Sequence, residues 1–301
     1  MAKTKAPSIR DERAFHNFAL VIMTLLALFC VVPFILMISV SFSSEAALVK
    51  GYKFIPMEFS LSAYKFLWLK RATILRAYGL TILVTVVGTA ANLLLTSLFA
   101  YPLSRKDFKH RNLFAFILFF TCLFNGGMTA SYIVWTQLFH IKNTVWAYLL
   151  PGSLMGAMNV LMVRNYYNAN IPYAIIEAAR IDGANDARIY TGIMLPLSKP
   201  VMTTIGLFAA LGYWNNWTNG LYYLVKRTDL YSIQNVLTNM LNNIQFLKTS
   251  AMDGINLDLS QLPSVGIRMA IAVIALIPVM IAYPLIQKSF VKGIVVGGVK
   301  G

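Results

Sequence analysis

The sequence has 301 residues, of which 58% are hydrophobic and only 12% are charged, and its formal net charge is +15. A soluble globular domain carries about a quarter charged residues. The charges are also unevenly spread, because six windows contain no Asp, Glu, Lys or Arg: 17–44, 77–104, 112–141, 143–163, 200–225 and 269–287. This composition excludes a soluble enzyme.

The six windows predict membrane-spanning helices. About 20 apolar residues are needed to cross roughly 30 Å of hydrocarbon, and each window reaches or nearly reaches that length. Barrel strands would alternate over about ten residues, and no segment does so. We therefore predict an all-α integral membrane protein with six transmembrane helices, at 17–44, about 77–102, 113–137, 143–163, 200–225 and 269–287.

The first window follows Arg10 and Arg13, which is also the layout of a signal peptide. It is longer than the 7–15 apolar residues of such a peptide, and no small-residue cleavage site precedes Glu45. An uncleaved first helix is therefore expected, between an N-terminal tail at 1–16 and an outer loop at 45–76.

Cysteine and histidine give no sign of a disulfide framework or a metal centre. Cys30 and Cys122 both lie inside apolar windows, where packing is their expected role. The three histidines, His16, His110 and His140, are scattered without the spacing of metal ligands.

Basic residues indicate the orientation of the chain. An even number of helices places both termini on one side, and Lys and Arg are slightly more frequent on the side of the termini. The tight basic loop 105–111 favours a cytoplasmic N-terminus, because short loops count most in the positive-inside rule. The first outer loop runs against the rule, since it also carries six basic residues.

The apolar windows lack acids and bases, apart from His140 at one edge. Ion-coupled carriers usually keep an ionisable group inside the membrane, although backbone carbonyls can hold sodium. A secondary carrier is therefore disfavoured and any driving energy is expected from another subunit. Sequence motifs of membrane-embedded hydrolases are absent as well.

The segment 164–199 is the longest on the predicted cytoplasmic side. Pro172 suits the first turn of a helix, residues 173–182 have helical apolar spacing, and Gly183 ends the helix. A second short helix is predicted through Tyr190, capped by Asn185 or Asp186.

Two interpretations of this helical hairpin remain open from the residues themselves. It is either a surface element that covers the base of the bundle or a docking element for another subunit. Ala178 and Ala179 would let a partner approach closely, while Glu177 and Arg180 offer charges for pairing.

The same segment resembles the EAA motif of ABC importer permeases. Glu177-Ala178-Ala179 is followed at family spacing by Gly183 and by Ile193-x-Leu195-Pro196, and Ile181 to Asn185 resembles the version found in carbohydrate importers. In that family the loop is cytoplasmic and docks into a cleft of the ATPase subunit. The resemblance therefore implies that both termini are cytoplasmic and that ATPase coupling involves Glu177, Ala178, Ala179, Arg180, Asp182, Gly183, Ile193, Leu195 and Pro196.

Two further stretches carry a resemblance. The tail within 288–301 ends like the maltose-type six-span permease subunit, and the resemblance implies that it reaches between the ATPase subunits through Gly297, Gly298, Val299, Lys300 and Gly301. Glycine-rich termini are otherwise often without fixed structure. Residues 124–127 and 149–152 resemble, more loosely, the polysaccharide permeases of Gram-positive bacteria.

Together these resemblances imply a type I importer permease subunit of the bacterial cytoplasmic membrane. Its expected partners are a second permease subunit, two ATPase subunits, an extracytoplasmic solute-binding protein, membrane lipid and a sugar, with no nucleic acid. The chain is expected to be non-catalytic and to bind no cofactor, while ATP and Mg belong to the ATPase. Permeases for peptides, amino acids or phosphonate are the closest alternative, a secondary carrier is a more remote one, and a membrane enzyme or scaffold is the least favoured.

Sugar sites combine aromatic faces with amide groups, which predicts a substrate pathway in the fifth window. The candidates are Trp214, Asn215, Asn216 and Trp217, with Asn125 beside a Gly pair in the third window. An interfacial aromatic belt and amide bonds between helices are the alternative interpretation. The partner permease often holds most sugar contacts in the family.

The outer loop 226–268 contains a charge-free stretch, 230–247, that is too polar to span a membrane. Its apolar residues repeat at helical spacing from Ile233 to Ile244, which predicts an amphipathic surface helix. The family uses this loop to contact its binding protein, but a helix that packs on its own bundle fits the pattern equally well.

Overall fold

The computed structural model describes residues 9–252 and 265–298, and most of these residues are helical. In this part of the chain only Ser43 and Phe59 form a β-bridge, so the prediction of an all-helical protein is confirmed. The chain divides into two compact units, Met1–Lys70 with Asn243–Leu276 and Arg71–Asn242 with Ile277–Gly301. Each unit is described by itself below.

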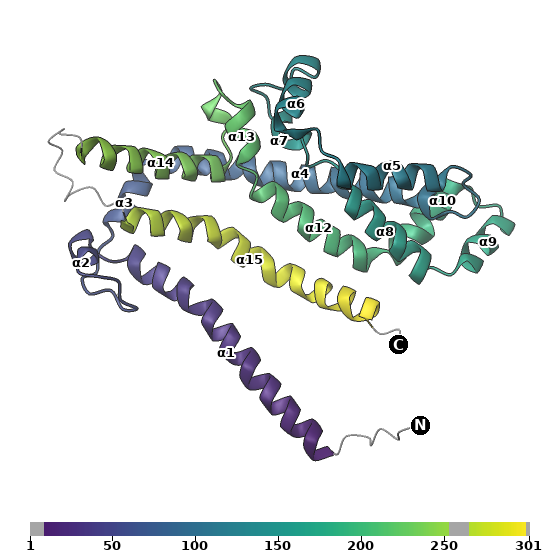
Figure 1. Cartoon of the computed structure of the whole chain (residues 1–301), viewed down its shortest axis with the longest axis horizontal. Helices are drawn as coiled ribbons and strands as arrows, with labels where there is room; N and C mark the ends of the chain where they lie inside the picture. Colours follow the sequence, from purple (N-terminus) through teal and green to yellow (C-terminus); the bar gives the residue numbers. More distant parts are fainter. Residues whose placement is uncertain (1–8, 253–264, 299–301) are drawn as a thin grey trace. The chain divides into compact units, whose positions relative to one another are not determined.

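The first unit contains α1 (Ile9–Ser41), α2 (Glu45–Val49) and α3 (Ser62–Leu69), which are labelled in Figure 1. Helix α1 begins within the predicted tail 1–16 and runs through the charged residues 10–13. Glu and Arg are good helix formers and extend the helix beyond its apolar window.

Between α1 and α3 the chain folds back on itself. The backbone N–H of Ser44 donates to the carbonyl of Glu58 at 3.0 Å, and that of Ser60 donates to Phe42 at 2.8 Å. The Ser44 hydroxyl caps α2. Glu45, in the first turn of α2, accepts a 2.8 Å hydrogen bond from the N–H of Gly266. The predicted outer loop 45–76 is therefore a folded segment.

The second unit is built around α4 (Arg71–Ser104), a single long helix. Three other helices pack against it: α5 (Arg111–Leu123), α8 (Ala157–Asn170) and α12 (Lys199–Trp214). Figure 1 shows these four helices side by side. Their shared core includes residues from each of them, such as Leu103, Leu118, Val163 and Ile205.

The remaining elements of this unit are short. They are α6 (Gly127–Ile133), the π-helical turn η1 (Val134–Leu138), α7 (Trp146–Leu149), α9 (Tyr173–Ile181), α10 (Asp186–Ile189), the π-helical turn η2 (Tyr190–Met194), α11 (Leu195–Leu197), α13 (Thr218–Tyr223) and the 3-10 turn η3 (Thr228–Leu230). Two helices have residues in both units, α14 (Ile233–Met252) and α15 (Val265–Gly298).

Three predicted helices are interrupted, which corrects their assignment as continuous spans. The helix at 113–137 breaks between α5 and α6 with a bend of 114°. There the Asn125 side chain accepts from the N–H of Gly127, whose φ is +80°. The helix at 200–225 ends at Trp214 and resumes as α13, across a turn in which Asn216 accepts from the N–H of Asn219.

The third interruption falls in the predicted helix 143–163. Helix α7 ends at Leu149, and α8 begins only at Ala157. Proline cannot donate the backbone hydrogen bond that a continuing helix needs, and Pro151 is followed by Gly152 with a φ of +70°. These two residues stop the helix inside an apolar window.

Length and composition identify two helices of the described residues as able to cross a membrane, Phe15–Ser41 and Arg71–Ser104. The number rises to four if each of two bent pairs is one span, Arg111–Leu123 with Gly127–Leu138 and Asp186–Leu197 with Lys199–Trp214. Val265–Ile281 is a shorter apolar helix. The six-span count therefore stays a prediction.

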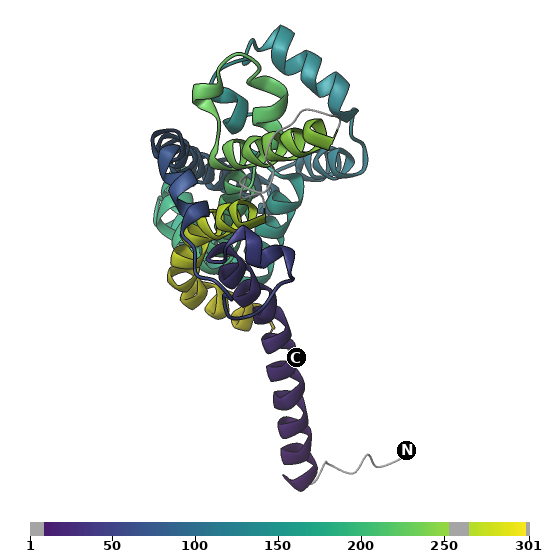
Figure 2. The same cartoon turned by 90° about the vertical axis from the view of Figure 1, so that its left-hand side faces the viewer.

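The segments that follow α5 and α12 meet on one side of the second unit, as the teal and light green ribbons in Figures 1 and 2 show. The rings of Tyr132 and Tyr223 stack at 5.6 Å. The N–H of Asn143 donates to the carbonyl of Tyr223, while the Asn143 side chain accepts from the N–H of Lys226. Polar contacts thus join the two segments.

The first turns of α14 pack on this same unit. Ile233, Val236 and Leu237 are buried, as the amphipathic pattern predicts for a helix that covers its own bundle. Asn235 is buried as well: its Oδ1 accepts from the Tyr148 hydroxyl at 2.9 Å, and its Nδ2 donates to the carbonyl of Trp217. The apolar stripe is therefore not free for a partner over these residues.

Candidate functional site

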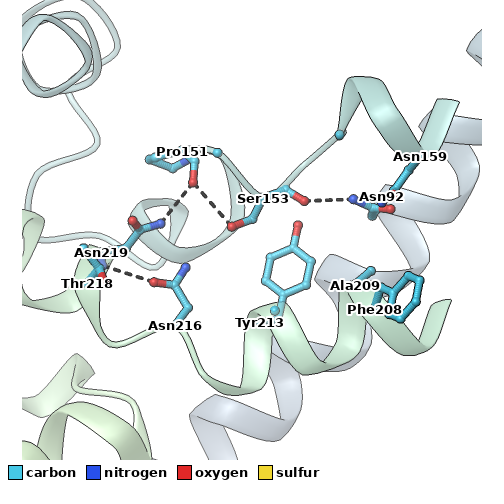
Figure 3. Close-up of a pocket in the computed structure, with 13 residues that line it drawn as sticks. Asn92, Pro151, Ser153, Asn159, Phe208, Ala209, Tyr213, Asn216, Thr218 and Asn219 are labelled. Carbon is cyan, nitrogen blue, oxygen red and sulfur yellow. Dashed lines mark hydrogen bonds between the residues drawn. The ribbon is translucent and has the colours of Figure 1, made fainter. Parts of the chain in front are cut away.

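A cavity of about 470 Å³ lies in the second unit where two of the helix breaks face α4. Figure 3 shows the residues around it. The lining comes from α4, the 150–156 break, α8, α12, the turn before α13 and the start of α13: Asn92, Pro151, Gly152, Ser153, Gly156, Asn159, Phe208, Ala209, Gly212, Tyr213, Asn216, Thr218 and Asn219.

Asparagine side chains hold the backbone of the breaks in place. The amide nitrogen of Asn92 donates to the carbonyl of Ser153 at 2.9 Å, and that of Asn219 donates to the carbonyl of Pro151 at 3.1 Å (Figure 3). A carbonyl freed from a helix must find such a donor where water is scarce. These two amides therefore support the cavity wall.

Other amides remain available to a ligand. The side-chain nitrogens of Asn159 and Asn216 donate no hydrogen bond to another described residue, and both residues are half-buried in the lining. The rings of Tyr213 and Phe208 add aromatic surface beside them. The lining residues carry no charge, so the cavity suits a neutral ligand surface with hydroxyl groups and C–H faces.

Of the predicted pathway residues, one lines the cavity and the others lie outside its lining. Asn216 lines the cavity, whereas neighbouring Asn215 donates to the carbonyl of Leu211 and accepts from Gln234. Trp214 is buried beside Tyr78, with ring centroids 6.2 Å apart. None of these contacts tests a role in transport, so the roles stay predictions.

Trp217 and Asn125 also lie outside the cavity lining. Trp217 is largely exposed, and its carbonyl accepts from buried Asn235. Asn125 is exposed and stabilises the break before α6. Sequence reasoning missed Asn92, Asn159 and Asn219, although each is an amide inside a charge-free window, and that was the available signal.

The predicted coupling segment forms the hairpin of α9 and α10. Helix α9 follows Pro172 and is closed at Gly183, whose φ is +77° and whose N–H donates to the carbonyl of Arg180. Asn185 caps α10 by accepting from the N–H of Arg188 at 2.9 Å. The local geometry is the one the sequence predicts.

Most of α9 faces away from the rest of the second unit. Ile176 is buried, and Ala179 packs partly against the core. Glu177 and Ala178 are exposed, and Ile181 is 86% exposed at the end of the helix. The exposed part of α9 thus presents both a carboxylate, Glu177, and an apolar side chain, Ile181.

The other residues of the segment have different surroundings. Asp182 is the C-terminal cap of α9, and Arg180 contacts Asp107 and Asp186. Ile193 and Leu195 pack against the core, and Pro196 lies in α11. Of the predicted tail contacts, Gly297 and Gly298 end α15, while Val299, Lys300 and Gly301 lie outside the described residues.

Comparison with known proteins defines the class of the chain. It matches the family "Binding-protein-dependent transport system inner membrane component" over residues 92–296. The chain therefore belongs to this family of transport permeases, whose members are membrane components of transport systems. The matched region contains the cavity and the α9–α10 hairpin.

Individual relatives are similar over nearly the whole chain. The "Polygalacturonan/rhamnogalacturonan transport system permease protein YtcP" of Bacillus subtilis is 38% identical, covering 96% of this chain and 99% of the relative. "Protein LplC" of the same organism is 37% identical over 90% of each. The crystal structure of a bacterial ABC transporter "involved in the import of the acidic polysaccharide alginate" matches with a TM-score of 0.77 and 30% identity, covering 95% of this chain and all of that one.

Gly88 on α4 provides a test of how the cavity wall is packed. A Cβ there would lie 2.5 Å from the ring of Tyr213, which is only 2% exposed. Overpacking costs about 1–3 kcal/mol, which exceeds the ~1 kcal/mol that alanine gains over glycine in a helix. Gly88→Ala should therefore lower the apparent melting temperature of the detergent-solubilised protein.

Gly79 on the same helix is the matched control, because nothing lies within 4 Å of its Cβ position. Gly79→Ala should leave the melting temperature unchanged or raise it. Equal melting temperatures for the two variants would contradict the packing of Tyr213 against α4.

Proposed function

We propose that this chain is the transmembrane permease subunit of a binding-protein-dependent ABC importer for carbohydrate, namely oligosaccharides or polysaccharide fragments. The observation that carries the proposal is the uncharged cavity, with aromatic and amide groups, in a chain of this permease family. The relatives described above include one permease named for polygalacturonan and rhamnogalacturonan transport, and a transporter involved in alginate import. The chain catalyses no reaction itself.

In this proposal the cavity contacts the rings and hydroxyl groups of the sugar. Pyranose rings present C–H faces to aromatic side chains and hydroxyls to amides, which is the combination offered by Tyr213, Asn159 and Asn216. The lining carries no cation for a carboxylate. Charge on an acidic substrate would therefore be balanced outside this cavity, by the partner permease or the binding protein.

The proposed assembly has a second permease subunit, two ATPase subunits and an extracytoplasmic solute-binding protein. In this proposal the chain has six spans in the cytoplasmic membrane of a bacterial cell, with both termini in the cytoplasm. ATP and Mg bind to the ATPase subunits. Support for the orientation comes from the basic loop 105–111 and from the resemblance of 177–196 to the EAA motif.

The α9–α10 hairpin is proposed as the docking element for an ATPase subunit, and the C-terminal residues 297–301 as a second contact. Exposed Glu177, Ala178 and Ile181 support the docking role, because they present both charge and apolar surface. ATP-driven closure of the ATPase dimer would move this hairpin and rock the helix bundle, so that the cavity alternates between the two sides of the membrane.

Purification from the native host tests the class of function directly. We expect an ATPase and a second permease to co-purify with this chain. With the solute-binding protein supplied outside the vesicles, the reconstituted complex should take up oligogalacturonides or neutral oligosaccharides only with ATP inside. Uptake by the chain alone, driven by an ion gradient, would refute the proposal in favour of a secondary carrier.

Substitutions of two neighbouring asparagines test whether the cavity binds the sugar. Asn216→Leu removes an amide from the lining and should raise the KM for oligosaccharide uptake about two- to tenfold, the equivalent of one hydrogen bond of about 0.5–1.5 kcal/mol. Asn215→Leu is the control, because both asparagines bond within the chain but only Asn216 lines the cavity. An equal KM for Asn216→Leu and the unmodified importer would remove the cavity from the pathway.

Substitutions at Gly183 test the docking role of the α9–α10 hairpin. Its φ of +77° is unfavourable for a β-branched residue but accessible to asparagine. Gly183→Val should lower uptake per ATP hydrolysed several-fold, whereas Gly183→Asn should stay close to the unmodified protein. Both activities are measured in proteoliposomes. Normal coupling in Gly183→Val would argue against docking through this turn.

A further inference from the structure

A buried arginine lies directly after α4. The side chain of Arg105 is only 5% exposed. Its Nε and Nη2 donate to the two carboxylate oxygens of Asp107, at 3.1 and 3.3 Å, and its guanidinium lies 5.6 Å from the ring centre of Tyr101. A two-pronged pair of this kind fixes geometry better than a single contact does.

The same group of charges continues into the α9–α10 hairpin. Arg180, in the last turn of α9, lies 2.6 Å from Asp107 and 3.5 Å from Asp186. Asp186 also accepts from the Tyr101 hydroxyl at 3.0 Å and lies 3.8 Å from Arg105. Arg105 and Asp107, which follow α4, thus form ion pairs with Asp186 and Arg180 of the hairpin.

Two further contacts join the hairpin region to α4. The ammonium of Lys106 lies 5.2 Å from the ring centre of Tyr173, the first residue of α9. After α10, the hydroxyl of buried Tyr190 is 2.6 Å from Ser97 on α4. The start of α9 and the segment after α10 therefore both contact α4 or the residues that follow it.

Apolar packing gives α9 limited support, because Ile176 is its one buried residue and Tyr173 and Ala179 pack only partly against the core. Exposed ion pairs usually contribute little, but this cluster differs in having a buried arginine at its centre. Hydrogen bonds from Arg105 and then from Arg180 hold the pKa of the Asp107 carboxyl well below its usual range. The Asp107 carboxylate therefore stays ionised across the physiological range of pH.

We propose that Arg105, Asp107, Arg180 and Asp186 form an ionic clamp that makes the α9–α10 hairpin a rigid extension of α4. These are positioning residues, and the proposal rests on the docking role given to the hairpin above. Movement of α9 by an ATPase subunit is then passed to α4, which carries Asn92 of the cavity wall about 20 Å further along the same helix.

Single substitutions in the reconstituted importer give the first test. Arg180→Gln should lower oligosaccharide uptake per ATP hydrolysed several-fold, whereas Arg180→Lys should retain most of it. Arg188→Gln is the matched control, since Arg188 lies in the same hairpin and forms no ion pair among the described residues. The same ratio in Arg180→Gln and Arg188→Gln would overturn the clamp.

A covalent cross-link, called the tie below, distinguishes a loss of rigidity in the hairpin from general damage to the protein. With Cys30 and Cys122 replaced by serine, Lys106→Cys and Tyr173→Cys would be joined by a short bifunctional thiol reagent, leaving the four charges intact. The tie should leave uptake per ATP unchanged, and in the Arg180→Gln background it should raise the lowered ratio. Loss of uptake in the tied protein, or no gain in the Arg180→Gln background, would show that the hairpin is not a rigid part of α4.

Failure of the clamp and failure of the proposed function give different results. If the unmodified complex shows no ATP-dependent uptake, the proposed function is wrong. If the unmodified complex transports and Gly183→Val uncouples it, while Arg180→Gln has no effect, the docking role stands and the clamp is wrong.

Discussion

The need of every backbone carbonyl for a donor governs the second unit of this chain. Apolar surroundings offer no water to replace a lost helical hydrogen bond, yet the chain breaks helices inside windows that contain no charge. The breaks persist because side-chain amides supply the missing donors, Asn92 to Ser153 and Asn219 to Pro151. The cavity lies where side-chain amides replace the backbone donors of a continuous helix. Its polar lining is therefore a consequence of the hydrogen bonds that the broken helices need.

Local signals made part of the structure predictable. Proline at the start of α9, Gly183 at its end and Asn185 at the next cap each act within one helical turn, and the structure has all three in the predicted places. The apolar windows also identified where helices run. They failed to show where helices stop, because counting charges ignores the proline, glycine and asparagine that interrupt helices at Pro151 and Asn216.

Other features depend on contacts between distant residues and could not be read from the sequence. Whether Asn215 or Asn216 faces the cavity is decided by the tight turn after Trp214, where one residue reverses the direction of a side chain. Asp107 and Arg180 are 73 residues apart. Their charges look like ordinary solvated residues of two separate loops until the fold places them together.

The cavity lining also has a consequence for protons. Its side chains are amides, hydroxyls, a phenol and apolar groups, and a phenol ordinarily titrates only near pH 10. A neutral ligand held by such groups is bound without uptake or release of a proton near neutral pH. In the proposed importer, occupancy of this site would therefore be thermodynamically unlinked from the proton gradient across the membrane, because no lining side chain gains or loses a proton near neutral pH.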